Sequence, residues 1–131
     1  FGHEIDVLAF KVQTKELIHV ETSGDAGKWE NRKRRFCEKK FIYSPEEYER
    51  IIGTRIARIR KIAICGFVRK TRTNLNWGNG IKVVLIPSFV EQITDSLRQM
   101  GGPLHEIVPE GYPLLRAIQL ALLYQSRRHE D

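Results

Sequence analysis

The feature that most constrains this chain is the stretch 3–23, HEIDVLAFKVQTKELIHVETS, whose pattern predicts a β-hairpin. Two largely apolar runs, residues 4–10 and 16–21, flank a short polar segment. Apolar and alternating runs of this length form strands, and a short polar connection between two of them suits a hairpin. We therefore expect two antiparallel strands at the start of the chain.

Acidic side chains gather at the open end of this expected hairpin. Side chains alternate across a strand, so Glu4 and Asp6 share one face, and Glu21 falls roughly opposite them if the hairpin closes near Gln13. Like charges repel and raise one another's pKa, so clustered carboxylates require a cation. Because magnesium prefers oxygen ligands, we expect Asp6, Glu21 and Glu4 to bind Mg²⁺ or Mn²⁺.

The same residues resemble the motif of the PD-(D/E)XK nucleases, the restriction-endonuclease-like superfamily that includes archaeal Holliday-junction resolvases. That motif is an acidic residue in a hydrophobic strand, a turn, and a second strand that ends in acid-any-lysine. The segment 2–9, GHEIDVLA, is similar to the first half, with Asp6 in the metal-binding position. The segment 20–23, VETS, is similar to the second half, with Glu21 as its acid and Ser23 where the family has lysine. A plain surface hairpin with scattered acids is the alternative.

The resemblance implies an α/β fold, a restriction-endonuclease-like mixed sheet flanked by helices, and hydrolysis of DNA phosphodiester bonds. It implies that Asp6 and Glu21 hold the metal ion, with the Thr22 carbonyl as a further ligand. The family's lysine positions or deprotonates the attacking water, which Ser23 cannot do as a cation. The expected catalytic residues are Asp6, Glu21, Ser23 and Lys28, with Lys33, Lys39 and Lys40 as equally open sources of the missing lysine.

A basic segment follows the hairpin, since half of the residues from 28 to 41 are Lys or Arg. In phosphodiester cleavage, acids hold the metal ion and bases hold the phosphates on either side. The residues expected to bind nucleic acid are Lys28, Arg32, Lys33, Arg34, Arg35, Lys39 and Lys40. The alternative is a solvated, charged helix with a thin apolar stripe.

A strong helix start follows at Ser44, because Pro45 suits a first turn and Glu47 completes a capping box. Apolar residues at helical spacing predict a helix that continues to about Ile59, with Gly53 as a weak point. Strands, helices and a loop are then expected in chain order at 61–68 (strand), 69–80 (loop), 81–86 (strand), 88–100 (helix), 104–108 (short strand) and 114–126 (helix).

Three further features carry expectations, and alternatives stay open for two of them, Trp77 and His19. Trp77, in a basic loop, either stacks on a nucleotide or packs against its own sheet. Ser88 and Glu91 form a second capping-box pattern, which predicts the start of the helix there. His19 alternates with Glu21, and it is either a partner of the acidic end or a satisfied histidine within the strand.

The composition is that of one globular domain over residues 1–131, with 41% hydrophobic and 29% charged residues. No run approaches the ~18 apolar residues of a membrane helix, so we expect no membrane contact and a cytoplasmic (intracellular) location. The net charge of +6 favours an anionic partner, most commonly nucleic acid. Cys37 and Cys65 lack metal-ligand spacing and are expected to be free thiols, with a disulfide between them as the alternative.

The expected function is therefore that of a metal-dependent DNA endonuclease, a magnesium-dependent phosphodiester hydrolase. The alternative is a catalytically inactive nucleic-acid-binding or assembly module of the same fold. Ser23 favours the alternative, as does the lack of room before Glu4 for the leading helix that the superfamily usually has. The helix 114–126 is apolar nearly all round, so we expect a homodimer through this helix, with a helix central to the fold as the alternative.

Overall fold

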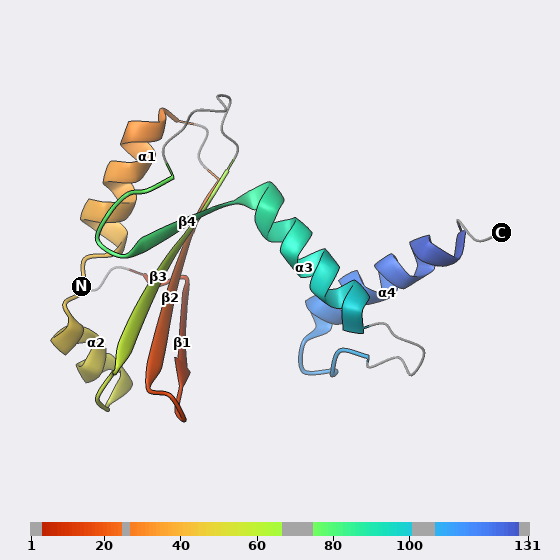
Figure 1. Ribbon diagram of the computed structural model, residues 1–131, viewed down its shortest axis with the longest axis horizontal. Coiled ribbons are helices and arrows are strands. Elements are labelled where there is room, and N and C mark those ends of the chain that lie inside the picture. Colours follow the sequence, from red (N-terminus) through yellow and green to blue (C-terminus); the bar gives the residue numbers. More distant parts are fainter. Residues whose placement is uncertain (1–3, 25–26, 67–74, 101–106, 129–131) are drawn as a thin grey trace. The chain divides into compact units, whose positions relative to one another are not determined.

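The structure is a computed structural model, and it describes residues 4–24, 27–66, 75–100 and 107–128 (Figure 1). In chain order its elements are β1 (Val7–Lys11), β2 (Glu16–Ser23), α1 (Trp29–Arg35), the π-helix η1 (Phe36–Lys40), α2 (Pro45–Ile52), β3 (Arg58–Cys65), β4 (Ile81–Leu85), α3 (Ile86–Met100) and α4 (Pro113–Arg128). The chain divides into two compact units, Phe1–Ile86 and Pro87–Asp131, and each is described by itself. The single domain over 1–131 stays a prediction.

The first unit is built on one sheet with the strand order β1-β2-β3-β4. β1 and β2 are antiparallel, and their register pairs Val7 with Val20 and Lys11 with Glu16. β3 is parallel to β2, and β4 is parallel to β3. The hairpin and the mixed α/β sheet flanked by helices are therefore confirmed.

The parallel pairing of β2 and β3 requires a long crossover, because parallel strands cannot be joined by a tight turn. The segment between them forms α1, η1 and α2, and these helices lie along the same side of the sheet (Figure 1). They cover the face that carries Leu17, His19 and Glu21, which are fully buried. The crossover thus places helix side chains over the second strand of the hairpin.

The core of this unit lies between η1 and the strands β3 and β4. Its buried members are Phe36, Phe41, Ala63, Cys65, Trp77, Ile81 and Val83. Trp77 is only 5% exposed and its ring lies 5.3 Å from that of Phe36, so it packs against its own sheet and does not offer a surface for base stacking. Cys37 and Cys65 are both free thiols, as expected, and burial raises the pKa of Cys65 to about 11.

The helix start at Ser44 is confirmed, because the Ser44 side chain accepts from the Glu47 N–H and the Glu47 carboxylate accepts from the Ser44 N–H. The expected continuation of this helix to Ile59 is wrong. Gly53 adopts a left-handed conformation with φ of 79° and ends the helix at Ile52. Glycine takes this conformation without the steric cost of a Cβ atom, so it caps the helix instead of weakening its middle.

In the second unit, α3 begins at Ile86, so Ser88 lies inside the helix and the expected second capping box is wrong. Among residues 113–125 of α4, Gln119 is the buried one, and its side-chain oxygen accepts from the Val108 N–H at 2.8 Å. The expected strand 104–108 lies mostly outside the described residues. Within the described ranges, no helix has the length and apolar character to cross a bilayer.

Candidate active site at the open end of the hairpin

The structure brings Asp6 and Glu21 together at the open end of the hairpin. Asp6 precedes β1 directly, and its backbone N–H lies 3.4 Å from Glu21 Oε1. Opposite residues of an antiparallel pair share a face, and the register that joins Val7 to Val20 places Asp6 opposite Glu21. The expected convergence of the two carboxylates follows from this register.

A lysine from the helical crossover lies between the two acids. Lys40 Nζ is 3.0 Å from Glu21 Oε2, 3.8 Å from Asp6 Oδ2 and 3.1 Å from the Thr22 carbonyl oxygen. The ammonium group therefore contacts two of the three predicted side-chain ligands, Asp6 and Glu21, and the Thr22 carbonyl that was expected as a further ligand. It also lies 5.4 Å from the centre of the Phe36 ring, and this cation–π contact helps to orient the Lys40 side chain.

A single π-helical turn explains how Lys40 reaches this position. The Phe41 N–H donates to the Phe36 carbonyl at 2.9 Å, five residues back along the chain. In an α-helix, residues five apart point about 140° away from each other, but the wider π turn places both rings on the sheet side. Phe36 and Phe41 are both buried, with ring centres 6.1 Å apart, and Lys40 projects beside them toward Glu21. π turns occur often at functional sites.

Asp6 is held as a carboxylate by the backbone across the hairpin. Its Oδ2 accepts from the Thr22 N–H at 2.7 Å and from the Thr22 hydroxyl at 2.8 Å. Partial burial raises the pKa of Asp6, but the two Thr22 hydrogen bonds and the Lys40 ammonium outweigh it, and the net pKa is below the ordinary value of 3.8. Asp6 is therefore ionised and oriented at neutral pH.

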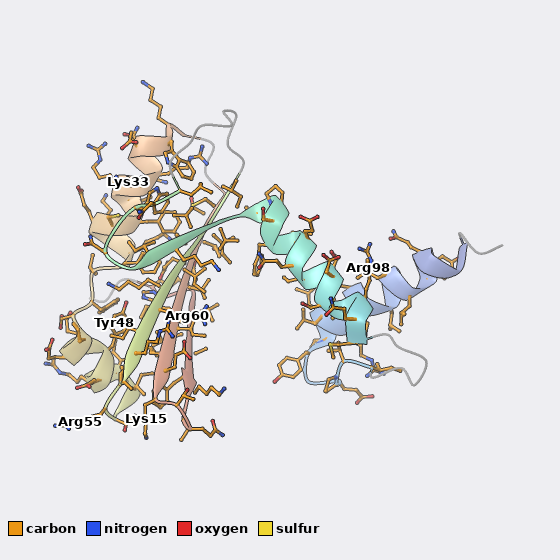
Figure 2. All side chains as sticks on the ribbon, in the orientation of Figure 1. Lys15, Lys33, Tyr48, Arg55, Arg60 and Arg98 are labelled. Carbon is orange, nitrogen blue, oxygen red and sulfur yellow. The ribbon has the colours of Figure 1, made fainter. Side chains whose placement is uncertain are left out.

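Glu21 is held from beneath by a buried hydrogen-bonded chain. His19 Nε2 lies 2.7 Å from Glu21 Oε1, and His19 Nδ1 lies 2.5 Å from the Tyr48 hydroxyl. All three side chains are fully buried, and Tyr48 reaches from α2 toward the strands (Figure 2). One oxygen of Glu21 is thus bound from the protein interior, while the other faces Lys40.

Tyr48 decides where the protons lie in the hydrogen-bonded series Tyr48–His19–Glu21. Burial, reinforced by the neighbouring Glu21, raises the pKa of Tyr48 to about 12, so its hydroxyl keeps its proton. An imidazole that accepts from Tyr48 at Nδ1 and donates from Nε2 to Glu21 satisfies every member of the chain. His19 therefore acts as a partner of the acidic end and not only as a satisfied strand histidine.

The position of Ser23 shows why a lysine from elsewhere fits here. Ser23 is two residues beyond Glu21 in β2, so the two share one face of the strand. A lysine at this position would project from that face, beside Glu21. Lys40 now enters the space next to Glu21 from η1 instead. Among the four candidate lysines, Lys40 is the one whose ammonium group contacts both acids.

The third predicted metal ligand, Glu4, is exposed, and it has no hydrogen bond or ion pair with another described residue. Within the described ranges, no three side chains of His, Cys, Asp or Glu gather around one point. The oxygens that surround Lys40 come from two carboxylates and one backbone carbonyl. A magnesium ion is commonly held by one or two carboxylates while it keeps several waters, so this donor set fits the ion.

The basic segment forms α1 and η1, and its members differ in availability. Lys28, Arg34, Arg35 and Lys39 are exposed, and Lys33 is partly exposed at the surface of α1 (Figure 2). Arg32 is buried instead, because its Nε donates to the Gly27 carbonyl at 2.9 Å and its guanidinium lies 5.2 Å from the Trp29 ring. Its contacts stabilise the loop before α1.

Sequence reasoning missed Tyr48 as a member of the site. Tyr48 follows the Ser44 capping box and reads as the first apolar residue of a helical stripe, so no local signal sets it apart. Thr22 was expected to contribute its carbonyl oxygen, but its N–H and hydroxyl also bind Asp6. A hydroxyl residue that directly follows Glu21, on the strand opposite Asp6, is a signal that could have indicated this contact.

No protein-family model matches the chain, and neither the curated proteins nor the solved structures contain a match. The arguments for its function therefore rest on the residues of the site itself.

Proposed function

We propose that the open end of the hairpin is a phosphodiester-hydrolysing site of the PD-(D/E)XK type, which acts on DNA with a divalent metal ion. The observation that carries the proposal is the position of Lys40 Nζ, 3.0 Å from Glu21 Oε2 and 3.8 Å from Asp6 Oδ2. Two strand carboxylates and one ammonium are the groups that this chemistry uses. The motif that resembles the superfamily lacks its lysine at Ser23, and Lys40 supplies the missing charge from another element.

Asp6, Glu21 and the Thr22 carbonyl would hold Mg²⁺ or Mn²⁺. When bound, the ion lowers the pKa of a coordinated water and stabilises negative charge on the phosphate. Thr22 orients Asp6 through two hydrogen bonds, and His19 orients Glu21 through one. Because these partners hold the carboxylates before any ligand arrives, the carboxylates need little reorganisation on binding, and the flexible Lys40 side chain is the group that moves aside.

Lys40 would act on the water and on the phosphate. Its ammonium lies within hydrogen-bonding distance of Glu21 and the Thr22 carbonyl, so a small movement of its flexible side chain reaches a water next to either group. There it can orient the water for in-line attack and neutralise charge on the phosphate oxygens. The exposed cations of α1 and η1 would bind the flanking phosphates.

The fold is consistent with this proposal at a coarse level. A mixed four-stranded sheet flanked by helices, with acids at the end of its antiparallel hairpin, is the arrangement expected from the resemblance. The restriction-endonuclease-like fold and an intracellular location remain parts of the proposal.

A specific observation favours the alternative, a catalytically inactive nucleic-acid-binding or assembly module. The Lys40 ammonium already compensates both carboxylates, so the acidic pair does not need a metal ion to be stable. In such a module the three residues would be a structural ion-pair network, and the exposed bases would still bind nucleic acid.

Titration with Mn²⁺ by calorimetry, followed by incubation with supercoiled plasmid DNA, distinguishes the two functions. The nuclease proposal expects Mn²⁺ binding that is lost in Glu21→Gln, and nicking that requires Mg²⁺ or Mn²⁺ and is lost in the same variant. Nicking that persists in Glu21→Gln would come from a contaminant and would remove the proposal. A wild type that binds DNA without binding Mn²⁺ would establish the inactive module.

A further inference from the structure

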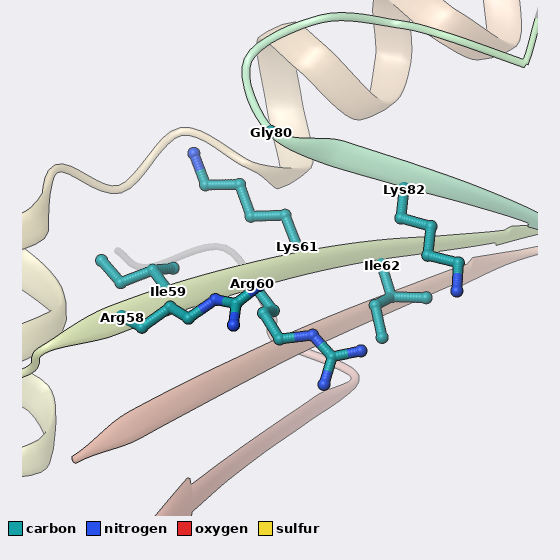
Figure 3. A pocket seen from close by; sticks show the side chains of 7 residues that line it. All are labelled: Arg58, Ile59, Arg60, Lys61, Ile62, Gly80 and Lys82. Carbon is teal, nitrogen blue, oxygen red and sulfur yellow. The ribbon is translucent and has the colours of Figure 1, made fainter. Parts of the chain in front are cut away.

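A second basic site lies away from the open end of the hairpin, beside the first residues of β3. β3 begins at Arg58, but its pairing with β4 begins only where Lys61 meets Ile81, so the first part of β3 has no neighbour in β4. A groove of about 400 Å³ fills this step in the sheet. Its lining residues are Arg58, Ile59, Arg60, Lys61, Ile62, Gly80 and Lys82 (Figure 3).

Cations approach this groove from both faces of the sheet. Arg58 and Arg60 alternate along β3, and Lys82 is paired with Ile62, so the three side chains share one face. Figure 3 shows these three on one side of the strands and Lys61 on the other. Same-face residues of a strand are ~6.6 Å apart and neighbouring strands ~4.8 Å apart, so the charges form a short row.

Within the described parts of the chain, a single carboxylate compensates the positive charge of this row. Glu16 Oε1 lies 3.4 Å from Arg60 Nη1. Arg58, Lys61 and Lys82 form no ion pair with another residue in the described parts of the chain. Like charges held this close repel, and an anion in the groove would remove the repulsion.

The chemistry of the lining limits what the ligand can be. Among the residues that the structure describes, the lining contains no aromatic ring on which a base could stack, and no His, Cys, Ser or carboxylate for catalysis. Arginine forks and lysine ammonium groups are the side chains that bind phosphate oxygens. A row of cations along an open edge matches a linear polyanion better than a compact one.

We propose that the groove at the edge of β3 binds consecutive phosphates of a nucleic-acid backbone, without reading its bases. The groove shares no residue with the Asp6–Glu21–Lys40 site, and Arg58, Arg60 and Lys82 lie on the opposite face of the sheet from Glu21. This binding therefore does not depend on the proposed cleavage. It would give the domain a second contact with DNA.

The test is the salt dependence of DNA binding, measured by fluorescence anisotropy with a labelled 20-base-pair duplex in EDTA, so that no cleavage occurs. Arg58→Glu/Lys82→Glu removes two phosphate contacts, and the slope of log affinity against log salt should lose roughly 1.8, or ~0.9 per contact. Arg50→Glu/Arg55→Glu is the matched control, since it changes net charge equally at exposed residues of α2 and the loop that follows it (Figure 2). The milder Arg58→Gln/Lys82→Gln keeps the test valid if charge reversal disturbs folding.

An equal loss of slope in the groove variant and in the control would overturn the proposal, because it would reflect net charge alone. Competition with tripolyphosphate separates a nucleic-acid site from a site for small phosphates. If the groove variant loses tripolyphosphate binding but keeps its DNA slope, the nucleic-acid ligand is wrong. The Asp6→Asn variant should keep the groove-dependent slope even if cleavage or metal binding is absent, which separates this proposal from the proposed function.

Discussion

The ammonium group of Lys40 lies 3.0 Å from Glu21 Oε2, although the two residues are separated by 19 positions in the chain and belong to a π-helix and a β-strand. The Lys40 side chain is 25% exposed, while the Glu21 side chain is 1% exposed. A nearly buried carboxylate is stable as an ion only with such a partner. This contact is therefore both a part of the fold and the centre of the proposed chemistry.

Replacing Lys40 by Met should separate these two roles. We expect DNA nicking to fall by about 100-fold or more, because a positioning and proton-transfer group is lost. We expect Mn²⁺ binding by calorimetry to be retained or strengthened, because the ammonium no longer competes for the oxygens of Glu21 and Thr22. The neighbouring exposed Lys39→Met is the control and should behave as the wild type. A folded Lys40→Met protein that no longer binds Mn²⁺ would contradict this account.

Asp6 should make the stability of the protein depend on pH in the acid range. Its pKa in the folded protein is below the ordinary value of 3.8, so its carboxylate contributes stability above that value and loses it as the pH falls through the folded-state pKa. Thermal unfolding should therefore show the wild type more stable than Asp6→Asn at pH 6, with the difference closing below about pH 4. A difference between the two proteins that is constant over this range would mean that the Thr22 contacts do not favour the ionised form.

The buried chain from Tyr48 to Glu21 should matter for stability more than for metal binding. Tyr48→Phe leaves His19 Nδ1 without its buried partner, and we expect a loss of about 1–3 kcal/mol in the free energy of unfolding by urea. Mn²⁺ binding should be retained, because the oxygen of Glu21 that faces Lys40 is Oε2, whereas His19 binds Oε1. Tyr112→Phe, at an exposed position, should be neutral. A loss below ~0.5 kcal/mol would mean that the hydrogen bond contributes little.

The basic segment should bind DNA through its exposed members. Arg34→Glu/Lys39→Glu should reduce the salt slope of duplex binding by roughly 1.8, equally for unrelated sequences, because phosphate contacts carry no sequence information. Arg32 is left out because its buried side chain holds the Gly27 carbonyl. If the slope of log affinity against log salt is unchanged, α1 and η1 are solvated, charged helices that do not bind DNA.

The exposed apolar residues of α4 predict that the protein forms a dimer through this helix. Leu114 is 73% exposed, and Leu120 and Tyr124 are also exposed. A twofold dimer would supply two active sites for the two strands of a duplex. We expect sedimentation at micromolar concentration to give a dimer for the wild type and a folded monomer for Leu120→Glu. A wild type that sediments as a monomer, free and with DNA, would remove the dimer.

The sequence by itself determined the hairpin, the convergence of Asp6 and Glu21, and the start of α2. These features depend on local rules: side chains alternate along a strand, a short polar connection sets the register, and Ser44 with Glu47 satisfies the first N–H groups of a helix. The end of α2 was misjudged because a glycine in a helical pattern is compatible with both a tolerated interior residue and a cap. Only the backbone conformation of Gly53 decides between them.

The tertiary structure alone decided which lysine joins the acids, that Tyr48 and His19 support Glu21, and that Arg32 is buried. These residues meet because the crossover between two parallel strands stacks α1, η1 and α2 on one face of the sheet. The π turn from Phe36 to Phe41 then aims Lys40 at the site. The Lys40–Glu21 and Tyr48–His19 contacts join residues 19 and 29 positions apart, and they form only when burial of the shared core outweighs the entropy of closing the chain between them.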